Sequence, residues 1–98
     1  NYAKKLTAMS GGTVTVEDGV VYVNKKKLLI PAAAGGMSSA ERAYFVMGNL
    51  AAAYRNGHAA KEAYVDGRTV MLGAQPIVSC TGNDADPAEI AVLLNRIK

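Results

Sequence analysis

The clearest alternation of β-branched and polar residues runs through "TVTVEDGVVYVNKKKLLI", residues 13–30. An Asp-Gly pair between two such segments is a strong signal for a β-hairpin, because both central residues of the favoured turn need positive φ. We therefore expect strands at residues 13–17 and 20–24, joined by Asp18 and Gly19. A third strand should cover residues 27–31 and end at Pro31.

Helical spacing of apolar residues follows. It predicts a helix over residues 39–56 with one apolar stripe, formed by Ala43, Val46, Met47, Leu50 and Tyr54. Ser38 and Glu41 have the spacing of a capping box, and Gly57 stands where a left-handed C-terminal cap belongs.

The second half repeats this order. "EAYVDGRTVMLGAQPIVSCT" predicts a hairpin around Asp66 and Gly67, followed by a strand at residues 76–81. "DADPAEIAVLLNRIK" predicts a second helix with an apolar stripe of Ile90, Leu93, Leu94 and Ile97. The order strands–helix–strands–helix predicts an α+β fold, an antiparallel sheet of hairpins with two helices on one face.

We interpret residues 1–98 as a single domain, because 98 residues suffice for one core. Residues 1–12 form an N-terminal segment with no clear periodicity beyond a short helical turn. Residues 13–57 and 58–98 form two strands–helix units. The units are alike in "YVNKK" at 22–26 and "YVDGR" at 64–68, which lie 42 residues apart and suggest a duplication.

Composition excludes several classes of protein. Half of the residues are hydrophobic and 19% are charged, which is typical of a globular domain. No apolar run is long enough to span a membrane. The net charge of +3 is small for a nucleic-acid binder. The single cysteine, Cys80, allows neither an internal disulfide nor a thiolate metal site. Because the chain starts at Asn1, we expect a larger or processed protein.

"GNDADPAEI", residues 82–90, is the densest group of functional-looking side chains. Asp86 precedes Pro87 and stands three residues before Glu89, which is the pattern of an N-cap, a first helical Pro and a capping box. The frame of an EF-hand calcium loop is missing. We therefore expect a helix start, with a weak Ca²⁺ or Mg²⁺ site as the alternative and no cofactor.

"GGMSSAER" places glycines and serines at the start of the first helix, where backbone N–H groups can bind an anion. The alternative is a flexible approach to a capped helix. Because a cation in a first helical turn opposes the helix dipole, we expect Arg42 to meet a carboxylate such as Asp84, or a bound anion. The candidate ligand-binding residues are Gly35, Gly36, Ser38, Ser39 and Arg42.

"VMLGAQPIV" is apolar almost throughout, which is typical of a strand covered on both sides. If the helices cover one side, a second subunit or neighbouring domain should cover the other. The candidate interface residues are Val70, Met71, Leu72 and Ile77.

Catalysis has little support in the sequence. His58 is the only histidine and follows the expected end of the first helix. Cys80 lies in an expected strand without a nucleophile-elbow pattern, so we interpret it as a core residue. The lysines of "NKKK" are typical of a solvated strand edge. We expect no enzyme, and no nucleic acid as partner.

Two stretches resemble a known module. "VVYVNKKKLLIP…GGMSSAERA" followed by "IVSCTGNDADP…EIAVLLNRI" resembles the extracytoplasmic module ahead of the membrane region in some bacterial small-conductance mechanosensitive-channel-family proteins. Ser38 or Ser39, Glu41, Arg42 and Ala43 match its helix start, and Val78, Asp84 and Ala85 match its later strand end. "Ser-Cys-Thr-Gly-Asn" departs from that strand end. The resemblance implies a non-catalytic, periplasmic or secreted module and no catalytic residues.

Together these observations predict a non-catalytic binding or assembly module of a larger or secreted bacterial protein. Its partner would be another protein or a second copy of the chain. Two alternatives stay open at this point. One is a small-anion or small-ligand site at residues 35–39, and the other is an accessory domain of an enzyme.

Overall fold

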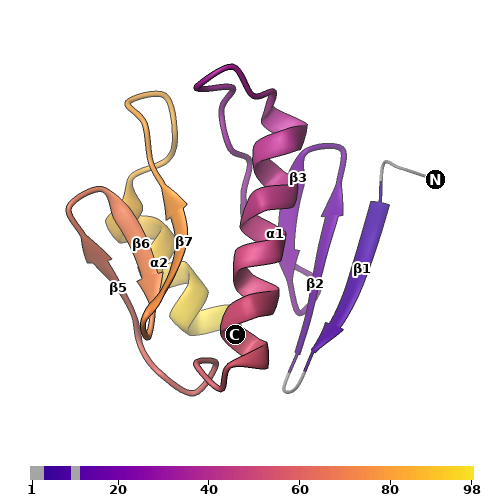
Figure 1. Ribbon diagram of the computed structural model, residues 1–98, viewed down its shortest axis with the longest axis vertical. Helices are drawn as coiled ribbons and strands as arrows, with labels where there is room; N and C mark the ends of the chain where they lie inside the picture. Colours follow the sequence, from indigo (N-terminus) through magenta and orange to yellow (C-terminus); the bar gives the residue numbers. More distant parts are fainter. Residues whose placement is uncertain (1–3, 10–11) are drawn as a thin grey trace.

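The computed structural model describes residues 4–9 and 12–98 and confirms an α+β fold (Figure 1). The element order is β1 (Lys4–Met9), β2 (Gly12–Glu17), β3 (Val20–Val23), β4 (Lys26–Leu29), α1 (Ser39–Arg55), β5 (Ala63–Asp66), β6 (Thr69–Leu72), β7 (Gln75–Ser79) and α2 (Pro87–Ile97). Neither helix of the described residues is long and apolar enough to cross a lipid bilayer.

The strands form two antiparallel sheets rather than the single sheet that we expected. One has the order β1-β2-β3-β4 and the other β5-β6-β7. Helix α1 packs on β2 and β3 of its own sheet and also against β7 of the other. Helix α2 packs on β5 and β6 and also against β4. Strands β4 and β7 do not pair with one another, and α1 lies between the two sheets (Figure 1).

Strand β1 was not predicted from the sequence. The expected short helical turn in residues 1–12 is wrong for Lys4–Met9, which pair with β2 from Lys4 opposite Glu17 to Met9 opposite Gly12. Residues 1–3 and 10–11 of that segment lie outside the described residues. The pairing partner, and not the local pattern, gives this segment its strand conformation.

Tight turns connect the hairpins. Asp18 and Gly19 have φ values of 53° and 80°, as the Asp-Gly signal predicts. In the second hairpin the turn lies one residue later than expected, because Asp66 pairs with Thr69 and the central residues are Gly67 and Arg68.

The two units share one strand register. Val21 pairs with Leu29 across β3 and β4, and Val70 pairs with Val78 across β6 and β7, each 49 residues after its counterpart. Both pairs are followed by the same irregularity, between Val21 and Tyr22 and between Val70 and Met71. The similarity of the halves is thus structural, but its offset is 49 and not the 42 of the short matching motifs.

The core lies between the helices and the inner faces of the sheets. The apolar stripe of α1 is buried as predicted, and in α2 Ile90 and Leu94 are buried while Leu93 and Ile97 pack partly against the core. The capping box of α1 is present, with Ser38 Oγ accepting from Glu41 N at 3.1 Å and Glu41 Oε1 accepting from Ser38 N at 2.7 Å. Helix α1 ends at Arg55, and Gly57 follows the C-cap residue Asn56 in the left-handed conformation, with a φ of 79°.

Candidate functional site

The loops that precede the two helices meet through one ion pair. Arg42 Nη1 lies 3.0 Å from both carboxylate oxygens of Asp84. The Asp84 side chain is 0% exposed and that of Arg42 is 11% exposed. The predicted carboxylate partner of Arg42 is therefore confirmed, and it joins the first unit to the second.

Further hydrogen bonds saturate the Asp84 carboxylate. Its Oδ1 accepts from Ala32 N at 2.7 Å. Its Oδ2 accepts from Thr81 N at 2.7 Å and from Thr81 Oγ1 at 3.1 Å. Since Ala32 belongs to the loop before α1 and Thr81 to the loop before α2, one carboxylate fixes both loops.

The Arg42 guanidinium also donates to two backbone carbonyls, one from each unit. Nη1 also donates to Ala32 O at 2.6 Å, and Nη2 donates to Ser79 O at 3.0 Å. We call Arg42, Asp84, Ala32, Ser79 and Thr81 the loop clamp. A guanidinium suits this position because its fork can reach several acceptors at once.

Burial, hydrogen bonds and nearby charges shift the pKa values of Asp84 and of the neighbouring Cys80. Burial of the Asp84 carboxylate opposes ionisation, but hydrogen bonds from Thr81 N, Ala32 N, Arg42 and the Thr81 hydroxyl outweigh it and hold the pKa of Asp84 below its ordinary value. Burial and the negative charge of Asp84 raise the pKa of the Cys80 thiol, with partial compensation from Arg68 and Arg42. A buried thiol with a raised pKa is a poor nucleophile.

The rest of the acidic cluster differs from expectation. Asp86 occupies the N-cap position of α2 with an extended backbone, but its side chain makes no capping hydrogen bond, so the predicted Asp86–Glu89 capping box is wrong. Asp84 instead makes the structural contacts, two residues earlier. Among the described residues, no three His, Cys, Asp or Glu side chains are grouped so that they could hold a metal ion.

At the candidate anion site at the start of α1, the polar side chains form hydrogen bonds with other groups of the same chain. Gly35 and Gly36 form a tight turn between Ala34 and Met37. Ser38 is held in the capping box, and Ser39 Oγ donates to Pro31 O at 2.6 Å. The structure brings Ser38, Ser39 and Arg42 to one end of α1, but each has a partner within the chain, and the Glu41 carboxylate already occupies the helix N-terminus.

The candidate interface residues lie mostly in the core. Val70, Leu72 and Ile77 are 0% exposed, whereas Met71 is half-buried. Strand β6 therefore alternates: Val70 and Leu72 face the core, and of the four candidate residues only Met71 is left partly exposed. Contact of this region with a second subunit or neighbouring domain stays a prediction. Met71 lies on the outer face of its sheet, where the register places it between Tyr64 and Pro76.

The one histidine is far from the thiol and from the serines of the α1 start. The His58 side chain packs against Gly73, just before β7, whereas Cys80 follows β7. Five residues of extended strand span about 17 Å, and α1 separates His58 from Ser38 by about 25 Å. His58 is thus too distant to activate Cys80, Ser38 or Ser39.

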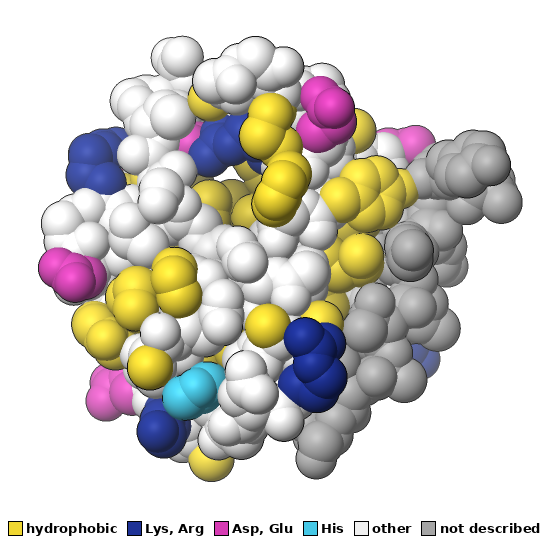
Figure 2. All heavy atoms as spheres, in the orientation of Figure 1, with side chains coloured by type: hydrophobic (Ala, Val, Ile, Leu, Met, Phe, Trp, Pro, Cys, Tyr) yellow, Lys and Arg dark blue, Asp and Glu magenta, His cyan; other side chains and the backbone are white. Residues whose placement is uncertain are grey.

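A hollow between α1 and β7 was not found from the sequence. It has a volume of about 170 Å³ and opens on the face of the molecule that carries α1 (Figure 2). Asn49 Nδ2 donates to Ile77 O at 2.9 Å inside it. We call it the α1–β7 groove; its lining residues are Met37, Arg42, Phe45, Val46, Asn49, Ile77, Val78 and Ser79.

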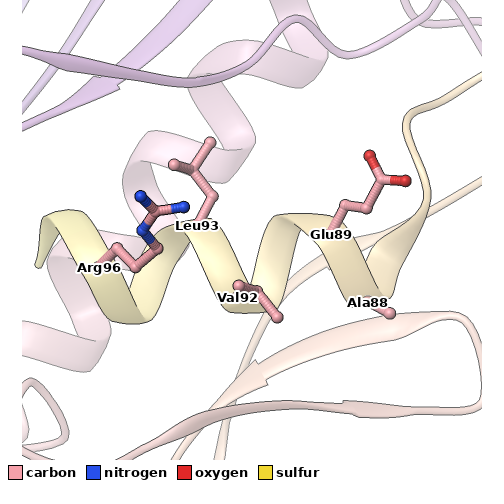
Figure 3. A pocket seen from close by; sticks show the side chains of 5 residues that line it. All are labelled: Ala88, Glu89, Val92, Leu93 and Arg96. Atoms are coloured by element: carbon pink, nitrogen blue, oxygen red, sulfur yellow. The ribbon is translucent and has the colours of Figure 1, made fainter.

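Helix α2 carries a second, shallow pocket of about 450 Å³. All the side chains that line it project from that one helix, and they are Ala88, Glu89, Val92, Leu93 and Arg96 (Figure 3).

The α1–β7 groove, in contrast, forms between segments that are distant in the sequence. No local sequence pattern therefore indicates it.

These features define a small α+β domain of two similar units joined by a buried ion pair. No family model, no curated protein and no solved structure matches this chain.

Proposed function

We propose that this chain is a non-catalytic binding or assembly module of a larger or secreted bacterial protein, and that the α1–β7 groove is its contact surface for another protein or a second copy. One observation carries the proposal. Phe45 is 62% exposed at the rim of a groove lined by Met37, Val46 and Ile77. Aromatic side chains beside apolar hollows are typical centres of protein interfaces.

A binding role is also supported by how the polar groups are used. Arg42 and Asp84 are saturated by each other and by backbone groups, so neither is left for proton transfer or for holding a substrate. Asn49 and Arg42 donate to the carbonyls of Ile77 and Ser79 on the edge of β7. That edge is thereby protected against strand pairing, which favours side-chain contacts as the mode of binding.

An extracytoplasmic location, periplasmic or secreted, is part of this proposal. It rests on the resemblance of the α1 start and the loop before α2 to the module ahead of the channel region described above. The buried Cys80 is compatible with an oxidising compartment, because it has no second cysteine in the chain and little exposure to other thiols.

Photo-crosslinking tests the contact surface without knowledge of the partner. A photoreactive phenylalanine analogue replaces Phe45 in the full-length protein in its native cells, and Val92 is replaced in a matched control. Val92 is similarly exposed, at 59%, but lies on α2. We expect a discrete adduct from position 45 and none from position 92. Equal labelling from both positions, or no adduct at 45 together with a monomer at about 1 mM, would reject the proposal.

A further inference from the structure

One end of the molecule gathers basic side chains from three separate segments. Asn24 Nδ2 in the β3–β4 turn donates to Ile97 O at 2.8 Å and to Lys98 O at 3.3 Å at the end of α2. Lys98 Nζ donates to Ala59 O at 2.9 Å in the loop after α1. We call this surface the basic end; its cations are Lys25, Lys26, Arg55, Lys61, Arg96 and Lys98, with Glu62 as the acidic side chain.

The opposite end gathers acidic side chains. The Asp18-Gly19 turn adjoins Ser39 at the start of α1. Arg68 in the β5–β6 turn donates to Cys80 O and Thr81 O, both at 3.1 Å, next to the loop before α2. We call this surface the acidic end; its exposed carboxylates are Glu17, Asp18, Glu41, Asp66, Asp86 and Glu89.

The acidic end has few compensating cations among the side chains that the structure describes. Arg68 is exposed, whereas Arg42 is neutralised by the buried Asp84. Strand pairing also places Lys4 opposite Glu17. The described side chains nevertheless give the two ends opposite net charges in a molecule whose total charge is only +3.

Helix ends explain part of this separation. Both helices start at the acidic end and finish at the basic end, because the loops before them meet at Asp84 and the segments after them meet at Lys98. Glu41 and Glu89 in first turns, and Arg55 and Arg96 in last turns, suit the helix dipoles.

The remaining charges have no helix to complement. None of them lies in a helix. On the basic side they are Lys25, Lys26 and Lys61, in the β3–β4 turn, in β4 and in the loop before β5. On the acidic side they are Glu17, Asp18 and Asp66, at the tips of two hairpins. The same polarity is thus repeated outside the helices, where the dipole argument does not apply.

We propose that copies of this chain associate head to tail, with the basic end of one against the acidic end of the next. The inference rests on the proposed assembly function and names its partner and its geometry. A phosphate-rich partner would account for the basic end alone, whereas a second copy accounts for both ends. Because the two surfaces differ, the contact is heterologous and extends into a chain of molecules. Exposed charge pairs are individually weak and are screened by salt, so the association is weak and salt-dependent.

Charge exchange tests this geometry with the 98-residue chain in sedimentation velocity. One variant, Lys26→Glu with Lys61→Glu, cancels most of the positive charge of the basic end and leaves the acidic end unchanged. The other, Glu17→Lys with Asp66→Lys, cancels most of the negative charge of the acidic end and leaves the basic end unchanged. We expect the native protein to associate at 50 mM NaCl and to dissociate at 500 mM NaCl, with an apparent Kd at least about tenfold higher at the higher salt. Each variant alone should be monomeric, and an equal mixture of the two should associate again.

All four positions are exposed, and far-UV circular dichroism checks folding. Neutral variants, Lys26→Gln with Lys61→Gln and Glu17→Gln with Asp66→Asn, serve if a charge reversal unfolds the chain; each should weaken association. Failure of the mixture to associate overturns the head-to-tail contact, and so does a native protein that stays monomeric at 50 mM NaCl and about 1 mM protein.

Two other results overturn the inference while identifying what replaces it. In the first, self-association is unchanged by NaCl concentration and by the charge variants but is lost in Phe45→Ala. The α1–β7 groove is then the assembly surface, and the proposed function stands. Binding to vesicles containing anionic phospholipid or to duplex DNA, lost in Lys26→Glu with Lys61→Glu, without self-association, assigns the basic end to a polyanion instead.

Discussion

Replacing Asp84 by alanine should be the most damaging single change outside the apolar core. The substitution leaves the partly buried N–H groups of Ala32 and Thr81 without their acceptor and leaves the Arg42 guanidinium, 11% exposed, without its counter-charge. An unsatisfied buried donor costs about 1–3 kcal/mol, and removing one partner of a buried ion pair costs about 3–5 kcal/mol. These contributions overlap, so we expect a loss of about 4 kcal/mol.

Urea unfolding at pH 7, followed by circular dichroism, measures this loss. Asp86→Ala is the matched control, because its side chain is exposed and makes no capping hydrogen bond, so it should change the unfolding free energy by less than about 0.5 kcal/mol. Arg42→Ala should cost less than Asp84→Ala, since the carboxylate keeps its two backbone donors. The double variant should cost less than the sum of the singles. If Asp84→Ala unfolds like Asp86→Ala, the loop clamp does not stabilise the fold.

Three further outcomes follow from the contacts. Because the pKa of Asp84 is lowered in the folded state, the ionised carboxylate contributes to the free energy of unfolding above the unfolded pKa of about 3.9, and this contribution is lost as the pH falls through the folded pKa. Urea titrations from pH 7 to pH 2 should therefore show a smaller decrease of the unfolding free energy in Asp84→Asn than in the native protein. Tyr54 has a buried hydroxyl with no hydrogen-bond partner among the described residues. Thermal unfolding of Tyr54→Phe should therefore show unchanged stability or a gain of up to about 1 kcal/mol, and a clear loss would contradict this. Gly73→Ala should destabilise the protein more than Gly67→Ala in the same assay. Both glycines have positive φ, but only at Gly73 would the added Cβ meet a ring, at 2.5 Å from Nδ1 of His58. Equal losses would show that the His58 ring moves aside.

Local patterns were sufficient for most elements. The Asp18-Gly19 turn, the Ser38–Glu41 capping box and the stop at Gly57 each depend on residues close in sequence, and each is present. The α+β class follows from their order. These features were predictable because their energies arise within one or two turns of chain.

Pairing between distant segments was not predictable. Strand β1 exists because β2 offers it a partner. On β7, the carbonyls of Ile77 and Ser79 accept from Asn49 and Arg42 of α1 and not from a strand of the other sheet. The apolar run at Val70–Leu72 looked two-sided, yet Met71 points away from the core that buries its neighbours. Composition cannot distinguish a two-sided strand from a one-sided strand that carries a methionine on its outer face.

The site illustrates the same limit. Asp86 satisfied every local rule for an N-cap, whereas Asp84 matched no pattern of a helix start and proved to be the residue with long-range contacts to Ala32 and Arg42. The one signal that pointed to it was electrostatic, since Arg42 stands in a helix turn that disfavours cations. A side chain that violates a local preference is thus a guide to a tertiary contact.

The crossed packing of the two units makes each one incomplete alone. Helix α1 needs β7, and α2 needs β4, so a fragment ending near Gly57 would expose the side of α1 that β7 covers, and the complementary fragment would expose the side of α2 that β4 covers. Neither fragment retains the loop clamp, because Arg42 and Asp84 fall on opposite sides of the cut. Two separately produced fragments should therefore be unstructured alone and recover the native circular dichroism when mixed, which makes this chain a candidate split reporter.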